Sequence, residues 1–516
     1  MVIKEKVSLK KEKKRRYRIS TKKTWISFFL GILWFSLFLF VLIADPILLM
    51  LKEYTRVTNG SFVHEVMLRE MEGIHLSAYV FNVTNTERFM AGEDHTLKVQ
   101  EVGPFTYREI RSNKDIEIDT EAQILRYTPQ VRLEFIPEES IGRPQDINVT
   151  APNIPMLGMT SNMAGAPWTR IPFNLLSTQL NSKAMVSMDA HNYLWGYQDT
   201  IVSLGYTITS VDFDKMGILD RLYDSYTKKP NRIEASIADE EKFMIKTVNG
   251  FKKLAMGDSV NPDECELCNT FENAFEGVGY PMGITSDFPI RIFKNGLCRI
   301  LDLEYEHTRL TDYGAEALVY NFSDNFFTLD PSEPSNGVLL LPDCFFGMPL
   351  AFSKPHFLDA DPSVYERIEG MKPDDRHRGW VTVDGKLGLT LETVFSLQIN
   401  LVIGDVSANT EAASFSNMIL PICYLRIEQP PLPDESIFFL NGMYVTGPYI
   451  ILALQIVFFI LAVVAWGYFG RAVYLNFIAK DNKAMSFPGT TIKEINANNV
   501  EDPLMTETQK TDSLRS

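Results

Sequence analysis

The stretch Trp25–Ala44 reads WISFFLGILWFSLFLFVLIA and contains no charged side chain. A second stretch, Tyr449–Gly470, reads YIILALQIVFFILAVVAWGYFG, and Gln455 is its only strongly polar residue. At a rise of about 1.5 Å per residue, each stretch is long enough to cross a bilayer core of about 30 Å as a helix. Buried helices of soluble proteins seldom contain so long an uninterrupted apolar run. The sequence therefore predicts two membrane spans.

The charged residues that flank the two stretches predict their orientation. Residues 1–24 hold eleven Lys and Arg against two Glu, and the segment after the second stretch begins with Arg471. The opposite flanks carry Asp45 and the run 428–446, which contains no Lys or Arg. The positive-inside rule then places both termini in the cytosol. A long basic leader, with no small-residue cleavage site behind the apolar run, disfavours a cleaved signal peptide.

Five segments follow: a basic cytosolic N-terminus (1–24), a first span (25–44), an ectodomain (45–448), a second span (449–470) and a cytosolic tail (471–516) expected to be disordered. The ectodomain carries 33 basic and 57 acidic residues, within a chain of net charge −15. This acidic excess argues against a nucleic-acid partner. Four N-glycosylation sequons support the topology because all lie between the spans: Asn59, Asn82, Asn148 and Asn321.

The ectodomain pattern predicts a β-rich fold. Short β-prone runs end at turn residues: Ile74–Asn82, Leu97–Val102, Phe105–Ile110, Ile124–Tyr127, Val131–Phe135, Thr393–Ile403 and Met418–Ile427. This spacing is typical of a largely antiparallel sheet or barrel. Apolar residues recur at helical spacing from Ile171 to Ala190, and Asp212–Tyr226 is also compatible with a helix. We therefore expect helices inserted into a β frame.

A search for catalytic and metal-binding signatures finds none. Gly257–Asn261 departs from the nucleophile-elbow pattern at its last position, and His64 lacks a second His four residues on. His356 lies between Pro and Phe, which favours a packed structural His over a catalytic one. Asp359 and Asp361 lack an EF-hand pattern and are typical of a solvated turn. We expect no enzymatic activity, no cofactor and no bound metal.

All five cysteines lie in the predicted ectodomain: Cys265, Cys268, Cys298, Cys344 and Cys423. Their odd number implies that at least one thiol is free or pairs with another chain. Cys265-Glu-Leu-Cys268 has the spacing of a redox or metal pair, but no second Cys or His pair accompanies it, which disfavours zinc. A short bridge between these two cysteines stays open, although such a bridge would be strained.

Several short motifs occur in a fixed order along the chain: Tyr79–Asn85, Glu101–Glu109, Asn153–Pro155, Leu194–Asp199, Cys298-Arg299 and Pro355–Phe357. With the two-span topology, this ordered set resembles the class B scavenger receptor family. That family includes the fatty-acid translocase, lysosomal integral membrane protein and sensory neuron membrane protein types. The resemblance covers residues 25–470, and the chain looks like a divergent member.

The resemblance implies an antiparallel β-barrel-like ectodomain with an apical helical bundle and an internal apolar tunnel. Lipids, lipoproteins or lipid-carrier proteins would dock at the apex, and lipid would pass down the tunnel to the membrane. Burial of an acyl chain gains about 0.8 kcal/mol per CH₂, so a dry tunnel lowers the cost of crossing water. The expected location is the plasma membrane, with the lysosomal or endosomal membrane as the alternative. Tyr474–Phe477 resembles a Tyr-based sorting signal.

The resemblance also implies roles for particular residues. The apical helix corresponds to Pro172–Ala190, and Lys183 falls close to a family Lys that contacts acidic or fatty-acid ligands. A solvated surface Lys is the plainer alternative. Cys298 and Cys344 match a family disulfide, whereas the usual partner of Cys268 is absent.

The chain departs from the family at several positions. Tyr424 stands where Trp is frequent, Asn192 where Glu is usual, and Thr86 where Pro is usual. Two other functions stay open beside the lipid receptor. One is a phagocytic or adhesive receptor that docks particles without lipid transfer. The other is a two-span ligand-gated channel, which the single polar residue Gln455 supports weakly. A homo-oligomer is also left open.

Overall fold

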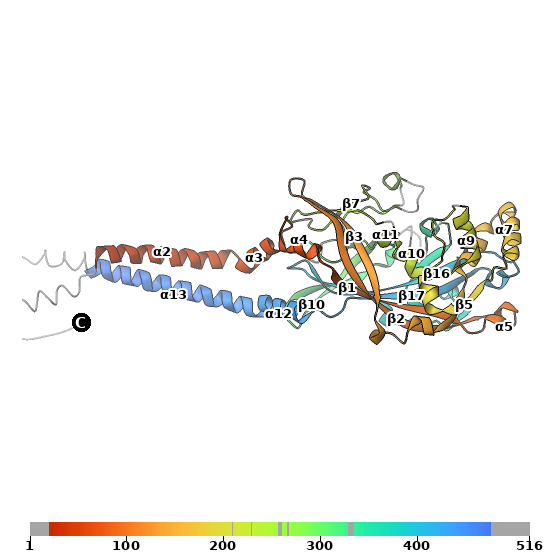
Figure 1. The fold of residues 1–516 in the computed structure, drawn as a ribbon. Helices are drawn as coiled ribbons and strands as arrows, with labels where there is room; N and C mark the ends of the chain where they lie inside the picture. The colour runs from red at the N-terminus through yellow and green to blue at the C-terminus, as the bar shows by residue number, and fades with distance from the viewer. Residues whose placement is uncertain are drawn as a thin grey trace, which may run out of the picture. The chain divides into compact units, whose positions relative to one another are not determined.

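Figure 1 shows the computed structural model, which describes residues 20–475 except 209, 229, 256–260, 266–267, 329–334 and 346. The chain divides into two compact units. One comprises residues 45–449, and the other joins the described residues up to 44 with those from 450 onward. Residues 1–19 of the predicted basic leader, residues 476–516 of the predicted tail and the end of the sorting signal lie outside the described residues.

Two long helices contain the predicted spans: α2 (Thr21–Ile43) and α13 (Gly447–Val473). Each reaches a mean hydropathy of 2.7 over an 18-residue window and is long and apolar enough to cross a membrane. Gln455, the polar residue of the second span, donates its side-chain amide to the Val41 carbonyl at 3.4 Å. Its amide therefore has a partner on the other helix, which explains how a Gln is accommodated in an apolar stretch.

The second helix begins well before the predicted span. Helix α12 (Asp434–Asn441), a π-helical turn (Gly442–Thr446) and α13 form one continuous helix of 40 residues. At about 1.5 Å per residue, such a helix is about twice as long as the bilayer core is thick. Its N-terminal part must therefore lie outside the hydrocarbon, in the unit that precedes Tyr449.

The larger unit is built on one 15-stranded sheet, and a separate pair, β4 (Asn148–Pro152) and β5 (Met185–Asp189), lies outside it. The strands of the large sheet are β1 (Met71–Val83), β2 (Leu97–Asp119), β3 (Ile124–Phe135), β6 (Ile233–Ser236), β7 (Ile245–Val248), β8 (Ala274–Phe275), β9 (Arg291–Ile292), β10 (Leu301–Leu310), β11 (Glu316–Phe322), β12 (Val338–Leu340), β13 (Leu350–Ser353), β14 (Ile368–Glu369), β15 (Trp380–Asp384), β16 (Leu389–Ile403) and β17 (Met418–Glu428).

The strands follow the order β7-β6-β3-β2-β1-β17-β16-β15-β11-β10-β9-β8, and all but two of the pairings in the sheet are antiparallel. The two ends of this path approach each other, because Lys253, just after β7, forms a bridge with Thr270, just before β8. The sheet is thus nearly closed into a barrel, which confirms the predicted fold class. In the register, Leu76 of β1 lies between Tyr107 of β2 and Ile427 of β17.

The predicted strands fall on observed ones, but two predicted breaks are absent. The predicted strands Ile124–Tyr127 and Val131–Phe135 are parts of the single strand β3. The sequence separated Leu97–Val102 from Phe105–Ile110 at Gly103-Pro104, whereas β2 runs through this dipeptide. A register shift against β1, between Ala78 and Val80, absorbs the irregularity. A β-bulge of this kind lets a strand continue past a Gly-Pro pair that would otherwise end it.

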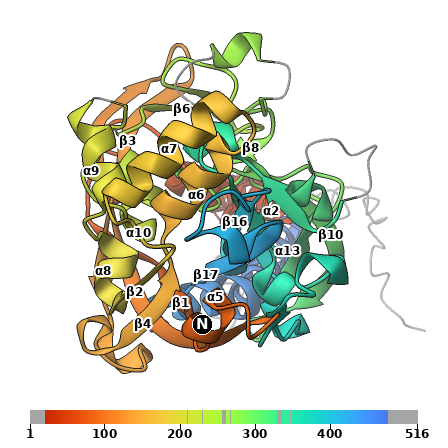
Figure 2. The same ribbon diagram turned by 90° about the vertical axis from the view of Figure 1, so that its right-hand side faces the viewer.

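Helices of the larger unit, besides α12, are α3 (Pro46–Tyr54), α4 (Phe62–Met67), α5 (Thr86–Met90), α6 (Ile154–Met163), α7 (Pro167–Gln179), α8 (Ala190–Trp195), α9 (Thr200–Thr207), α10 (Ile218–Leu222) and α11 (Asp224–Thr227). Figure 2 looks onto the end of this unit that carries α5 and α6–α9. In Figure 1, α3 and α12 lie at the opposite end of the same unit.

The predicted helix from Ile171 to Ala190 is correct only in its first half. Helix α7 ends at Gln179, and Met185 belongs to strand β5, which pairs with β4. Backbone pairing along Asn148–Pro152 therefore overrides the helical spacing there. The second predicted helix, Asp212–Tyr226, contains the short helix α10 and most of α11.

Candidate ligand-docking surface

Helix α7 presents two distinct faces. Pro167 opens the helix at a position where its missing N–H costs nothing, and Phe173 and Ser177 are buried on the inner face. Figure 2 shows α7 crossing the end of the unit, beside α6.

The outer face of α7 is apolar. Trp168, Ile171 and Leu175 are 78%, 64% and 61% exposed. Their spacing of three and four residues places them in one stripe along the helix. A contiguous stripe of large exposed apolar side chains marks an interaction surface, because it gains free energy only when it leaves water.

Polar contacts fix this helix to a neighbouring loop. Asn174 donates its side-chain amide to the Ala408 carbonyl at 3.1 Å. Asn409 in turn donates to Asn174 Oδ1 at 2.9 Å and contacts Ser177 Oγ at 3.4 Å. The stripe is therefore held on a well-anchored helix and is not part of a free loop.

Lys183 lies between α7 and β5, not on the helix where the resemblance placed it. Its Nζ forms an ion pair with Glu411 Oε1 at 2.8 Å, and its side chain is 55% exposed. An acidic ligand that used Lys183 would have to compete with Glu411. The structure thus gives Lys183 a partner within the chain, and its role in ligand binding stays a prediction.

Motif residues that are far apart in sequence meet in the interior. Asn153 donates to the Lys183 carbonyl at 2.9 Å and to Asp199 Oδ2 at 3.0 Å, and it accepts from Tyr197 OH at 3.1 Å. Asp199 also caps α9 by accepting the Ile201 N–H at 2.8 Å. Two motifs therefore form one hydrogen-bonded cluster beneath the helices.

A second cluster surrounds Glu109, whose side chain has no exposed surface. Glu109 accepts a hydrogen bond from Tyr223 OH at 2.6 Å and pairs with Lys294 Nζ at 3.0 Å. Burial alone would raise the pKa of this carboxyl, but Lys294 and Arg111 hold the pKa below its usual value. Glu109 is therefore an ionised, fully paired carboxylate. The sequence did not identify this cluster, because its members follow no common spacing.

His356 is buried and fully hydrogen-bonded. Its Nε2 lies 2.7 Å from Glu101 Oε2, and its Nδ1 accepts the Lys372 N–H at 3.2 Å. We assign the proton to Nε2, which donates to Glu101. The His356 N–H also donates to Gln398 Oε1 at 2.7 Å. These contacts account for His356 as a structural residue that ties the loop before β14 to the sheet.

The remaining acidic residues singled out in the sequence also have structural partners. Asp359 pairs with Arg378 at 2.7 Å and with Lys354 at 2.5 Å, while Asp361 accepts the Ser363 N–H at 2.9 Å. Within the described residues, no group of three or more His, Cys, Asp or Glu is arranged to hold a metal ion.

Two of the departures from the family pattern, Tyr424 and Asn192, are accommodated by local contacts. Tyr424 is buried and stacks on Tyr79 with 4.3 Å between ring centroids. Asn192 donates its side-chain amide to Asp189 Oδ2 at 2.6 Å beside the start of α8. Cys423 has no exposed surface and is a free thiol whose pKa is raised by burial. Cys423 is thus sequestered from solvent.

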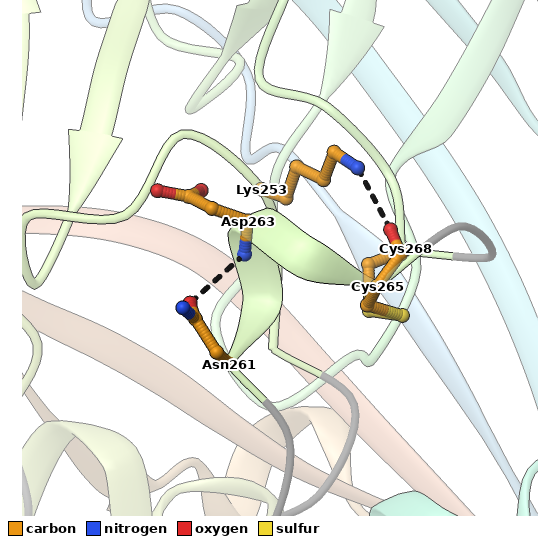
Figure 3. Close-up of a disulfide and its surroundings, with 5 residues drawn as sticks. All are labelled: Lys253, Asn261, Asp263, Cys265 and Cys268. Carbon is orange, nitrogen blue, oxygen red and sulfur yellow. Dashed lines mark hydrogen bonds between the residues drawn. A yellow bond between two sulfur atoms is a disulfide. The ribbon is translucent and has the colours of Figure 1, made fainter.

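The other four cysteines form two disulfides. Cys298 is joined to Cys344, with Cα atoms 6.1 Å apart, and Cys265 to Cys268, with Cα atoms 5.3 Å apart. Figure 3 shows the second bridge, where Lys253 Nζ donates to the Cys265 carbonyl at 2.7 Å. This contact holds the start of the bridge against the segment that follows β7.

Three of the four sequon asparagines are exposed, namely Asn59, Asn148 and Asn321. Asn82 is half-buried, and its Oδ1 accepts the Thr150 N–H at 2.8 Å. Its side-chain nitrogen makes no hydrogen bond to the described residues, so a glycan on that nitrogen is compatible with this contact.

The exposed apolar stripe on α7 is the feature that the sequence analysis missed. Its signal was present, because Trp168, Ile171 and Leu175 repeat at helical spacing opposite Phe173. A helix with apolar residues on both faces gives no sequence cue to which face is covered. Only the packing of Phe173 against the interior distinguishes the inner face from the outer.

Comparison with known proteins agrees with this architecture. The model of the CD36 family matches residues 26–473. Lysosome membrane protein 2 of Homo sapiens is 26% identical over 463 residues, which cover 82% of this chain and 92% of that protein. Scavenger receptor class B member 1 of Rattus norvegicus is 23% identical over 431 residues, covering 79% and 82%. The same receptor of Cricetulus griseus is 26% identical over 373 residues, covering 68% and 70%. These relatives are named as a membrane protein and a receptor, not as enzymes, and the chain belongs to the CD36 family.

Proposed function

We propose that this protein is a membrane receptor that docks lipids, lipoproteins or lipid-carrier proteins through the outer stripe of α7. The stripe itself is the observation that carries the proposal, because Trp168, Ile171 and Leu175 are 61–78% exposed on an anchored helix. Aromatic and aliphatic side chains on one helix face insert into a lipid surface and gain the free energy of leaving water. The scavenger receptor names of two relatives support a receptor role.

The second step of the proposal is transfer. Lipid leaves the docked particle and moves through the apolar interior of the ectodomain toward the membrane. Buried apolar side chains such as Met156 and Leu157 of α6 and Leu401 of β16 would line such a route. Movement of lipid along such an interior needs no bond to be made or broken, so the proposal includes no catalytic step.

Lys183 has a secondary place in this proposal. An acidic group on the ligand would exchange with Glu411 for the ammonium of Lys183, which lies beyond the end of α7. Because the pair is half-exposed, this exchange contributes little free energy. The apolar stripe is therefore the main source of affinity.

The membrane topology completes the proposal. Both termini lie in the cytosol, and the larger unit, with Asn59, Asn82, Asn148 and Asn321 glycosylated, faces the extracellular or lumenal side. The basic leader and the sequons between the spans support this orientation. The plasma membrane is the proposed location, and the lysosomal or endosomal membrane is the alternative.

The test replaces the stripe with serine in the triple variant Trp168→Ser, Ile171→Ser and Leu175→Ser. These side chains are exposed, so the fold should persist, while the docked state loses its apolar contact. We expect particle binding by cells that express the variant to weaken at least tenfold, which corresponds to about 1.4 kcal/mol. Binding of fluorescent lipid particles at equal surface expression provides the measurement.

A matched control removes three exposed apolar side chains elsewhere: Ile141→Ser, Val278→Ser and Leu340→Ser. This control should bind particles as the unaltered chain does. Equal binding by the stripe variant and the unaltered chain would overturn the docking proposal. Particles that carry separately labelled lipid and protein distinguish the two steps. Bound particles whose lipid never enters the cell membrane would leave docking intact and remove transfer.

A further inference from the structure

Several exposed apolar side chains lie on elements close to the two points where the chain leaves the larger unit for the candidate spans. These points are Asp45 and Tyr449. We define the base collar as Leu49, Met50, Leu310, Leu389 and Val445, which are 50%, 58%, 71%, 43% and 44% exposed. The collar is drawn from α3, β10, β16 and the π-helical turn, so segments far apart in sequence contribute to it.

Packing beneath the collar fixes these elements to one another. Leu51 of α3, Leu387, Leu391 of β16, Leu440 and Met443 form one buried cluster. Because Leu51 faces inward, its neighbours Leu49 and Met50 face outward.

The hairpin that joins β10 to β11 is held at the same level. A Cβ on Gly314 would lie 3.7 Å from Val445 Cγ2 and 4.0 Å from Tyr444 Cβ. Tyr313 also packs against the buried cluster beneath the collar. Leu310, at the end of β10, is therefore placed beside the turn that leads into α13.

The hairpin that joins β15 to β16 is held there too. Lys386 Nζ lies 3.5 Å from Asp45 Oδ2, next to the end of the first candidate span. Tyr444 OH donates to the Asp384 carboxylate, with its oxygens at 2.6 and 2.7 Å. Leu389 follows this hairpin directly.

The chain limits how far the collar lies from the membrane. Leu49 and Met50 follow Ala44 by five and six residues, and Val445 precedes Tyr449 by four. At about 1.5 Å per helical residue, these separations are about 6–9 Å. The headgroup layer on each side of a bilayer is about 5–8 Å thick. Leu49, Met50 and Val445 therefore lie within reach of the lipid surface that holds the spans, and the hairpins that carry Leu310 and Leu389 pack against the same elements.

From these observations we infer that the base collar is a lipid-contact surface, inserted into the outer headgroup layer of the bilayer that holds the spans. Its occupant is phospholipid of that bilayer, since both chain connections emerge within the collar. Leu310 and Leu389 thus act as membrane anchors, although neither is near a span in sequence. This inference is independent of docking at α7, because the two surfaces lie at opposite ends of the unit (Figure 1).

The test uses full-length protein in phosphatidylcholine nanodiscs, with a single fluorophore on Leu310→Cys, Leu389→Cys or Met50→Cys. Labelling is selective because four native cysteines are in disulfides and Cys423 is buried. Ile141→Cys is the control, since Ile141 is 53% exposed and lies outside the collar. Lipids with a nitroxide near the headgroup report contact with lipid, and iodide reports contact with water.

We expect collar labels to be quenched at least threefold more strongly by the nitroxide lipid than the Ile141 label, and to be shielded from iodide. The side chains replaced are exposed, so the fold should tolerate all of these variants. The inference is overturned if the labels at Leu310 and Leu389 are quenched by iodide as fully as the label at Ile141. Quenching of the Met50 label alone would not support the inference, because Met50 lies next to a span in sequence.

Discussion

At the scale of single residues, the pairing of Glu109 with Lys294 is the contact whose loss we expect to be most costly. Glu109 has no exposed surface, and Lys294 Nζ lies 3.0 and 3.2 Å from its two carboxylate oxygens. Lys294→Met leaves a buried carboxylate without its nearest cation, which we expect to cost about 3 kcal/mol. The expected result is a lower melting temperature of the full-length protein in detergent, measured by tryptophan fluorescence.

Lys228→Met is the matched control for this prediction. Lys228 pairs with Asp220 at 3.1 Å, but its side chain is 55% exposed, so water replaces the lost partner. We expect a change of about 0–1 kcal/mol for this variant. Equal melting temperatures for the two variants would show that Glu109 tolerates the loss of Lys294, either by taking up a proton or through Arg111.

The residues that reveal the family are mostly structural. His356, Tyr197 and Asp199 are buried and make hydrogen bonds within the fold. Each of these residues must match specific hydrogen-bond partners, so the residue types at these positions are fixed and form recognisable sequence motifs. Trp168 and Leu175 are mostly exposed to solvent instead. Residue motifs therefore predicted the framework well and the exposed stripe of α7 poorly.

At the scale of elements, the two disulfides should differ in their effect on stability. The chain-entropy model relates stabilisation to the length of the closed loop. The sequence separation is 46 for Cys298–Cys344 and 3 for Cys265–Cys268. This model gives about 4 kcal/mol for the longer loop and about 2 kcal/mol for the shorter one. We expect Cys298→Ser with Cys344→Ser to lower the melting temperature more than Cys265→Ser with Cys268→Ser.

Peptide mass spectrometry without reduction checks that each double variant removes only its own bridge. A larger loss of stability for the Cys265 and Cys268 variant would contradict the loop-length argument. That result would assign the shorter bridge a local role, in which Lys253 and the bridge together hold the segment after β7.

The sequence predicted an element correctly where its residue pattern matched the way the segment pairs with its neighbours in the structure. Met418–Ile427 is a β-prone apolar run and pairs on both sides, so the predicted strand lies within β17. It failed at Met185, where helical spacing continued into a segment that pairs with β4. Local spacing carries no information about a partner strand more than thirty residues away.

At the scale of the whole molecule, the sequence predicted two spans and a β-rich unit between them, and the structure confirms this fold class. It did not predict the base collar. Leu310 and Leu389 become neighbours of the chain connections only through the hairpins that bring them there. The apolar spans are local features of the sequence, whereas a surface built from four elements depends on the closed sheet.

The predicted topology can be tested with glycosylation as a marker of the side of the membrane. Treatment of the full-length protein with peptide N-glycosidase should increase its electrophoretic mobility, because the sequons lie between the spans. Replacing Asn59, Asn82, Asn148 and Asn321 with Gln should abolish this shift. In that background, Lys6→Asn creates a sequon ending at Ser8, and Gln509→Asn creates one ending at Thr511. Neither should be glycosylated if both termini are cytosolic, whereas a glycan at either position would reverse the assignment made from the basic leader.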